Sequence, residues 1–344
     1  MRKLWFPGLM AALLWSACSN EFDVAAPYKD IPVVYGIISP DDTAHYIRVE
    51  RAFINADSSA FDIALIPDSL YYAEGAISVF LERVSTGQRY QLNRVNGANE
   101  GYFREQGTFA QYPNRLYKVK PVHQGDIVKP GEKYKLVIER ADGRPPVTAE
   151  TTVPNTLMLV SPNPEAIPPQ VAIYGNSVLL DWRTSASGVL FDVYMKIRYR
   201  EIQNNGNVTL DSIRWKVARN VVRENTLISG GVYRGKTTFS PQAFYAALLG
   251  HIQAPDDVSS RYFNGIDFEI QGAGPEIAEY QGIEAINAGL TGAEISTRYT
   301  NLSEGYGIFT ARRTWHFNDF GLRPGTVDSL NADPTRKAVL KFKG

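Results

Sequence analysis

Residues 191–202, FDVYMKIRYREI, decide the fold class. Apolar side chains stand at every second position from Phe191 to Tyr199, with mainly charged side chains between them. A period of two residues predicts a β-strand with one face in a core and the other in solvent. Residues 204–207, Asn-Asn-Gly-Asn, predict a turn, and residues 212–219 then repeat the alternation. We therefore expect a long antiparallel hairpin in the second half of the chain.

The first half of the chain shows the same kind of pattern in shorter strands. Residues 31–38, IPVVYGII, are almost continuously apolar, which predicts a strand buried on both faces. Residues 76–92 predict a hairpin, and GEKYKLVIE with VTAETTVP, within 131–154, predicts another. Four prolines within residues 161–169 predict a junction between domains.

Two segments interrupt the strands with helical signals. In residues 239–252, Ser240 is suited to cap a helix and Pro241 to occupy its first position. Residues 275–289 predict a second helix, and AVLKFKG at 338–344 predicts a last strand. The sequence therefore predicts a mainly β protein with two antiparallel β-sandwich domains, of which the second carries helical insertions. The expected domains are residues 31–155 and 176–344, joined by a proline-rich junction at 156–175.

The N-terminal residues predict export and a lipid anchor. Two basic residues precede the apolar run 4–17, which ends in small side chains directly before Cys18, the one cysteine of the 344-residue chain. This layout is typical of a secretory signal, and a cysteine at this place predicts lipidation. We expect a signal peptide at 1–17, a lipid on Cys18 and a tether at 18–30. Two or more acyl chains on Cys18 would give a stable membrane anchor; the alternative is a plain secretory signal cleaved after Ala17.

Composition excludes a strongly charged partner. Removal of the signal peptide takes away Arg2 and Lys3 and leaves 34 basic against 36 acidic side chains. A mature chain this close to neutrality lacks the basic field that nucleic acid binding requires. We therefore predict no nucleic acid partner.

The sequence contains no catalytic or metal-binding motif. The four histidines lie in separate segments without metal-ligand spacing, and His45 is expected in solvent beside a turn. Asp41 and Asp42 lack the spacing of a calcium loop and are expected to bond the local backbone of that turn. We predict no metal, no cofactor and no enzymatic activity, although a pair of carboxylates for glycoside hydrolysis would meet only in the folded chain.

A late aromatic segment supplies the candidate contact residues. Tyr306, Phe309 and Trp315 lie close together in sequence, and Gly305 and Gly307 next to them allow backbone bends. Such aromatics stack on sugar rings or dock on partner proteins. The competing interpretation places Phe309 and Trp315 in the core of a strand.

Several of these segments together resemble a known set of proteins. The cysteine-ended signal, YGIISPDD with HYIRVERAF at 35–53, the hairpin within 131–154 and YTNLSEGYGIF at 299–309 are similar to uncharacterised Bacteroidetes-type outer-membrane lipoproteins. One departure is Trp15, where such signals usually carry leucine. The resemblance implies an immunoglobulin-like domain followed by a fibronectin type III-like domain, and it supplies no catalytic residues.

The resemblance also implies a place and a role. It implies an outer-membrane protein held by Cys18, favours the cell surface over the periplasmic face, and suggests a supporting role beside a TonB-dependent transporter. We therefore expect a non-catalytic protein that acts through protein–protein contacts. The alternative is a surface glycan-binding module, in which the aromatic segment would bind the sugar.

Overall fold

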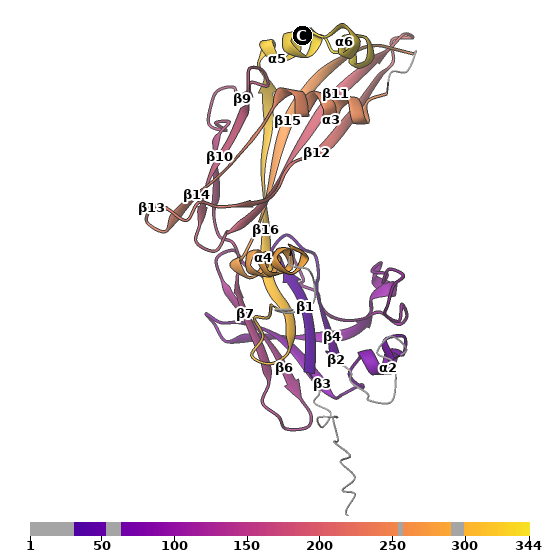
Figure 1. The fold of residues 1–344 in the computed structure, drawn as a ribbon, viewed down its shortest axis with the longest axis vertical. Helices are drawn as coiled ribbons and strands as arrows, with labels where there is room; N and C mark the ends of the chain where they lie inside the picture. Colours follow the sequence, from indigo (N-terminus) through magenta and orange to yellow (C-terminus); the bar gives the residue numbers. More distant parts are fainter. Residues whose placement is uncertain (1–30, 53–62, 254–256, 290–298) are drawn as a thin grey trace, which may run out of the picture.

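The computed structural model describes residues 31–52, 63–253, 257–289 and 299–344. The fold is mainly β, as predicted, and its large antiparallel sheets form two sandwich-like lobes (Figure 1). One sheet of 12 strands runs through both lobes, in the order β12-β11-β15-β16-β1-β2-β5-β4-β3-β6-β7 with β9 beside β16. A second sheet, in the order β13-β14-β10-β8, covers one face of the upper lobe.

The lower lobe in Figure 1 is built from the first seven strands. They are β1 (Ile31–Ile38), β2 (His45–Ala52), β3 (Ile77–Arg83), β4 (Gln88–Asn96), β5 (Arg115–Val119), β6 (Lys133–Arg140) and β7 (Val147–Thr152). Alternate side chains of these strands meet in one core, with Val34, Ile47, Val79 and Leu136 all fully buried. A short helix α2 (Pro67–Leu70) and a turn of 3-10 helix, η1 (Gly97–Glu100), lie at the edge of this lobe.

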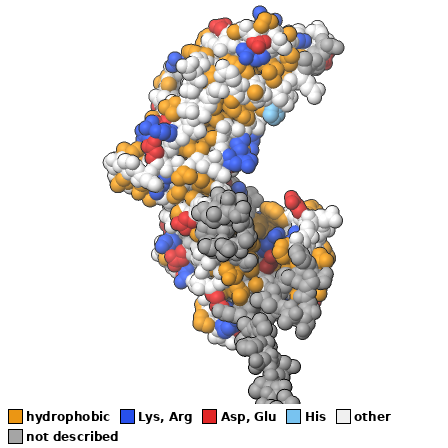
Figure 2. All heavy atoms as spheres, in the orientation of Figure 1, with side chains coloured by type: hydrophobic (Ala, Val, Ile, Leu, Met, Phe, Trp, Pro, Cys, Tyr) orange, Lys and Arg blue, Asp and Glu red, His pale blue; other side chains and the backbone are white. Residues whose placement is uncertain are grey.

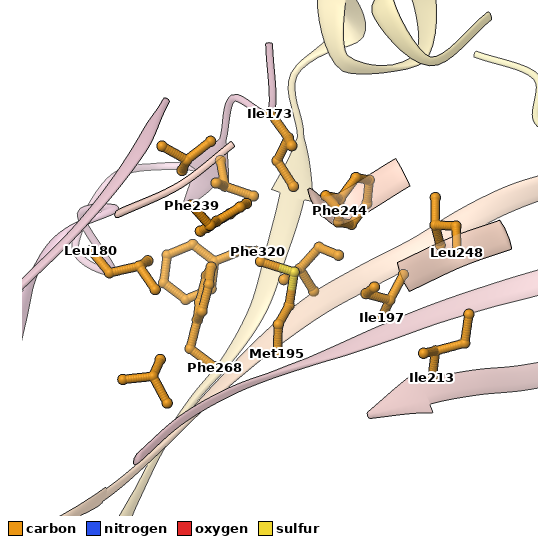
Figure 3. Close-up of a cluster of buried hydrophobic side chains, with 14 of the residues drawn as sticks. Ile173, Leu180, Met195, Ile197, Ile213, Phe239, Phe244, Leu248, Phe268 and Phe320 are labelled. Carbon is orange, nitrogen blue, oxygen red and sulfur yellow. The ribbon is translucent and has the colours of Figure 1, made fainter. Parts of the chain in front are cut away.

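The upper lobe has a second core between the two sheets. Its strands are β8 (Leu157–Ser161), β9 (Gln170–Val171), β10 (Val178–Ser185), β11 (Leu190–Gln203), β12 (Val208–Val222), β13 (Leu227–Ser229), β14 (Val232–Phe239) and β15 (Val258–Ala273). The predicted hairpin is confirmed as β11 and β12, paired over most of their length. Figure 3 shows Met195 and Ile197 of β11 pointing into a core that also receives Leu180 from β10.

Both predicted helices are present. The first is α3 (Pro241–His251), in which the Ser240 hydroxyl accepts a hydrogen bond from the Ala243 amide at 3.1 Å. The second is α4 (Pro275–Gly289). Figure 3 shows Phe244 and Leu248 of α3 in the upper core.

The predicted last strand is wrong. Residues Pro334–Leu340 form helix α6, next to α5 (Pro324–Asn331). The reason is local, because the Asp333 carboxylate caps the first turn by accepting from the Thr335 amide at 2.8 Å. Lys341, in the left-handed conformation with φ 51°, then ends the helix.

Strand β16 (Tyr306–Leu322) belongs to both lobes. Its first part pairs in parallel with β1, and its second part pairs antiparallel with β15. Phe309 is therefore buried in the lower core and Phe320 in the upper core. The parallel part depends on Gly307, which has φ +113° and lies so close to β1 that an added Cβ would sit 1.9 Å from the Val34 carbonyl oxygen.

The structure differs from the predicted junction at 156–175. Residues Leu157–Ser161 are strand β8, and Gln170–Val171 pair with β16, so the proline-rich stretch lies within the upper lobe. The chain passes to the upper lobe just before β8, returns to the lower lobe between β15 and Leu302, which bridges Ala149 of β7, and passes to the upper lobe again within β16. The sequence range expected for the second sandwich thus contributes a central strand to the first.

Candidate functional site

An open groove lies on the outer face of the lower lobe, below the waist that Figure 2 shows between the two lobes. It has a volume of about 600 Å³ and is open along one side. Its lining comes from β1, β2, β5, β16 and the nearby loops: Tyr35, Gly36, Ile37, Asp42, Thr43, Ala44, Tyr46, Arg48, Tyr102, Phe103, Asn114, Leu116, Ile308 and Arg312.

The floor of the groove is the face of β1 that we expected to be buried. Val34 and Ile38 are fully buried in the core, but Tyr35 is 45 % and Ile37 is 44 % exposed. The continuous apolar run of β1 therefore does not mean burial on both faces. It places two large apolar side chains on a surface that a strand of this sheet would normally fill with polar residues.

Aromatic side chains form one wall of the groove. The rings of Tyr46 and Tyr102 are 4.8 Å apart at an angle of 57°, and Tyr102 and Phe103 are 51 % and 77 % exposed. The loop that carries Tyr102 and Phe103 is held by the buried side chain of Asn114, which donates a hydrogen bond to the Tyr102 carbonyl oxygen at 2.9 Å. The wall is thus fixed by the protein and stays open to solvent.

The polar side chains around the groove bond one another. Arg48 donates to the Asn114 side-chain oxygen at 3.1 Å. The Tyr46 hydroxyl donates to Glu100 at 2.9 Å, and Lys118 lies 2.5 Å from the same carboxylate. The hydrogen bonds from Lys118 and Tyr46 hold the pKa of Glu100 below its ordinary value. Glu100 is therefore ionised near neutral pH, which suits a structural role and not that of a general acid.

The groove continues into a second cavity of about 210 Å³ at the waist. Ile37 and Arg312 line both cavities, and α4 contributes Ile277 and Gln281 to the second. Helix α4 is fixed here by Glu276, whose carboxylate accepts a hydrogen bond from the Thr310 hydroxyl at 3.0 Å. Burial raises the pKa of Glu276 above its ordinary value, although its hydrogen bonds oppose this shift.

The turn between β1 and β2 fastens β16 at the same place. Asp42 pairs with Arg312 at 3.0 Å, and the Asp41 carboxylate accepts from the Thr314 amide at 2.6 Å. We expected both aspartates to bond the local backbone of the turn, whereas their carboxylates contact Arg312 and Thr314, which are about 270 residues away in the sequence. They fix the strand where it passes from one lobe to the other.

The three predicted contact residues are not brought together. Tyr306 is 37 % exposed, whereas Phe309 is fully buried in the lower core and cannot contact a ligand. Trp315 packs against the upper core, with the Arg313 guanidinium 5.1 Å from the centre of its ring. Tyr306 and Trp315 are nine positions apart in a strand that rises about 3.3 Å per residue, so about 30 Å separates them. The aromatic segment is a shared core strand and does not form one site.

The remaining predicted positions have mixed outcomes. Cys18 lies outside the described residues. His45 is 2 % exposed, which corrects the expectation that it is solvated, and burial lowers its pKa. In the part of the chain that the structure describes, no group of three His, Cys, Asp or Glu side chains could hold a metal ion.

The described helices include none with the length and apolar character needed to cross a membrane.

A family model described as "Domain of unknown function (DUF4249)" matches residues 19–314. No curated protein is significantly similar to the chain. Among solved structures, one match is the C-terminal globular domain of an oligosaccharyltransferase from Pyrococcus abyssi, 10 % identical, with a TM-score of 0.18. The match covers 72 % of this chain and 40 % of that one, so the chain spans about two fifths of the structure's length. A likeness of this size establishes neither a shared fold nor a shared function.

Proposed function

We propose that this chain, which belongs to the DUF4249 family, is a non-catalytic lipoprotein of the outer membrane that acts through protein–protein contacts. Lipidated Cys18 would hold it to the bilayer, and we place it at the cell surface in preference to the periplasmic face. An outer-membrane transporter of the TonB-dependent class is the partner that the family resemblance suggests. We also assign the lower lobe to an immunoglobulin-like sandwich and the upper lobe to a fibronectin type III-like sandwich.

The observation that carries this proposal is the exposed apolar floor and wall of the groove. Tyr35, Ile37, Tyr102 and Phe103 are each at least 44 % exposed and lie in one cavity. Exposed apolar residues gathered in this way mark interaction surfaces more often than scattered ones do. Aromatic side chains at the centre of such surfaces contribute most of the binding free energy in protein complexes.

The bonded polar groups around the groove favour an apolar occupant. Arg48 donates to Asn114 and lies 3.9 Å from the carboxylate of Glu50, and Lys118 pairs with Glu100. A strongly charged ligand would find no unpaired opposite charge there, whereas an aromatic or aliphatic side chain would displace water at little cost. We therefore expect the groove to receive an apolar loop of the partner protein.

A photo-crosslinking amino acid at position 103 tests this contact in intact cells. We expect one discrete adduct with a transporter protein, identified by mass spectrometry, and weaker adduct formation when Tyr102→Ala is combined with it. Position 158 is the matched control, because Met158 is 61 % exposed on the other sheet of the upper lobe. Equal adducts from both positions, or none from position 103, would contradict the proposal.

Lipidation is tested separately. Labelling with a fatty-acid analogue should mark the wild type and leave Cys18→Ala unmarked, and the variant should leave the membrane fraction. Equal labelling of both chains would remove the anchor from the proposal without affecting the groove. Protease treatment of intact cells distinguishes the outer face from the periplasmic face.

Glycan binding is the second candidate, and one feature of the groove favours it. The exposed rings of Tyr35 and Tyr102 line the same cavity, and aromatic side chains of this kind can stack on a sugar ring. Calorimetry with surface polysaccharides decides between the candidates. Binding that is lost in Tyr35→Ala would favour the glycan, and no heat with any polysaccharide would exclude it.

A further inference from the structure

A second pocket lies at the end of the lower lobe where β1 begins. It has a volume of about 410 Å³ and is lined by Arg51, Tyr72, Ala73, Ala76, Ile77, Arg140, Ala141, Asp142 and Arg144. Figure 1 shows the turn between β6 and β7 at the same end of the molecule as the start of β1. The pocket has no residue in common with the groove described above.

Three arginines from separate segments meet in this pocket. Arg51 is near the end of β2, where it pairs with Pro32 of β1. Arg140 is the last residue of β6, and Arg144 lies in the turn that follows. The strand pairing therefore brings together cations that are far apart in sequence.

Arg140 is buried and only partly satisfied. Its side chain is 3 % exposed, and its Nη2 atom lies 2.5 Å from the carboxylate of Glu304. Its Nε and Nη1 atoms are buried and have no hydrogen-bond partner among the described residues. Donors of this kind are rare in folded proteins, because each loses its bonds to water without replacement. The side chain lines the pocket, so a ligand bound there lies beside a guanidinium whose hydrogen bonds the described residues satisfy only in part.

Arginine charge exceeds acidic charge around the pocket. Arg144 pairs with Asp142 at 2.7 Å and Arg140 with Glu304. Arg51 donates to the carbonyl oxygens of Asp68 at 2.6 Å and Ser69 at 3.3 Å, and has no carboxylate partner in the described part of the chain. Among the described residues that line the pocket, three arginines thus stand with one aspartate, so this lining is positive in a protein that is close to neutral overall.

We propose that this pocket binds a phosphate group. Guanidinium groups donate paired hydrogen bonds that match the oxygens of phosphate, and convergence of several arginines is typical of phosphate recognition. The phosphate belongs either to a lipid headgroup of the membrane or to free inorganic phosphate. This proposal does not depend on the groove or on its partner protein, because it is argued only from the arginines of the pocket.

Calorimetry with inorganic phosphate tests the site in the mature chain carrying Cys18→Ser, at constant ionic strength. We expect saturable binding that becomes at least about tenfold weaker in Arg51→Gln and in Arg144→Gln, because each removes charge-assisted hydrogen bonds. Arg89→Gln is the matched control, since Arg89 is an arginine of the same lobe that lies outside the pocket and pairs with Glu139 at 2.7 Å. Unchanged binding in both pocket variants would overturn the proposal.

Vesicles then distinguish the two sources of phosphate. The same unlipidated chain is sedimented with phosphatidylglycerol vesicles, with Arg51→Gln and Arg89→Gln alongside. Sedimentation that is lost in Arg51→Gln and kept in Arg89→Gln assigns the site to lipid headgroups. Calorimetric binding without sedimentation assigns it to free phosphate, and absence of both overturns the proposal.

Arg140→Met provides a further check by a different measurement. Phosphate that binds the folded chain raises its unfolding midpoint in proportion to the occupancy. We expect this rise in the wild type and in Arg89→Gln, and its loss in Arg140→Met. An equal rise in Arg140→Met would show that the buried guanidinium does not serve the ligand and would overturn the proposal.

Discussion

One arginine lies at each end of the core of the lower lobe, and the two arginines differ in their hydrogen-bond partners. Arg83 is the last residue of β3 and lies opposite Tyr134, while Arg140 is the last residue of β6 and lies opposite Ile77. Both side chains point to the core side of their strands, and both residues are 8 % exposed. The two positions are therefore equivalent in strand geometry and in burial.

Their partners are not equivalent. Arg83 donates to the Tyr134 hydroxyl at 3.2 Å and to the carbonyl oxygens of Asp126 and Ile127 at 2.8 and 2.9 Å. Among the described residues, Arg140 has one carboxylate partner, and its Nε and Nη1 atoms have none; its side chain lines a pocket. Burial alone therefore does not tell a structural arginine from a binding one. We propose that the partners do, because, of these two arginines, it is Arg140 that keeps buried donors unbonded by the described residues.

The largest expected effect is at the Arg83 end. Arg83→Met should lower the free energy of unfolding of the lower lobe by about 3 kcal/mol, because it removes the three hydrogen bonds that the guanidinium donates to Tyr134, Asp126 and Ile127 at this end of the core. Urea unfolding followed by circular dichroism measures this change, with the exposed Arg89→Met as the control. A loss below about 1 kcal/mol would mean that the hydrogen bonds of Arg83 do not stabilise this end of the core.

Arg140→Met should have a smaller effect on the same measurement. We expect a loss of about 1 kcal/mol or less without phosphate, because removal of two unpaired donors offsets the loss of one ion pair. The side chain of Glu304 is 32 % exposed, so its carboxylate can return to water when Arg140 is absent. A loss as large as that of Arg83→Met would break the comparison between the two ends.

The sequence predicted strands and helix caps better than it predicted partners. The alternation of residues 191–202 and the cap at Ser240 depend on neighbours in sequence, and both are confirmed. The alternation Ile77-Val79-Leu81 also shows on which side Arg83 lies. It does not show that carbonyl groups more than 40 residues away bond that arginine, because those contacts exist only in the fold.

The groove was missed for a related reason. Residues 31–38 are nearly all apolar, so the sequence gives no sign that Tyr35 and Ile37 face solvent. The parallel pairing of Val34 with Gly307 was equally hidden, because it joins segments about 270 residues apart. The two glycines on either side of Tyr306, Gly305 and Gly307, were the available signal: with φ above +100° they allow close approach to β1 rather than a ligand-binding bend.

The smallest expected effect is on the pH dependence of stability, and it again separates the two ends. Burial raises the pKa of Tyr134 above its ordinary value of 10.0, while its hydrogen bond from Arg83 opposes this shift. Above about pH 10 the unfolded chain therefore releases this phenolic proton more readily than the folded chain does. The free energy of unfolding must then fall as the pH rises through this range.

Tyr134→Phe should remove part of that fall, by less than about 1 kcal/mol between about pH 9 and about pH 11, since one group changes the slope by at most about 1.4 kcal/mol per pH unit. Part of the fall remains, because burial also raises the pKa of Tyr117 in the same lobe. Urea unfolding at several alkaline pH values measures the slope. Arg140→Met should keep the slope of the wild type, since its hydrogen bonds do not include Tyr134. If Tyr134→Phe also kept the slope of the wild type, burial would not raise the pKa of Tyr134 in the folded chain, and the prediction would be wrong.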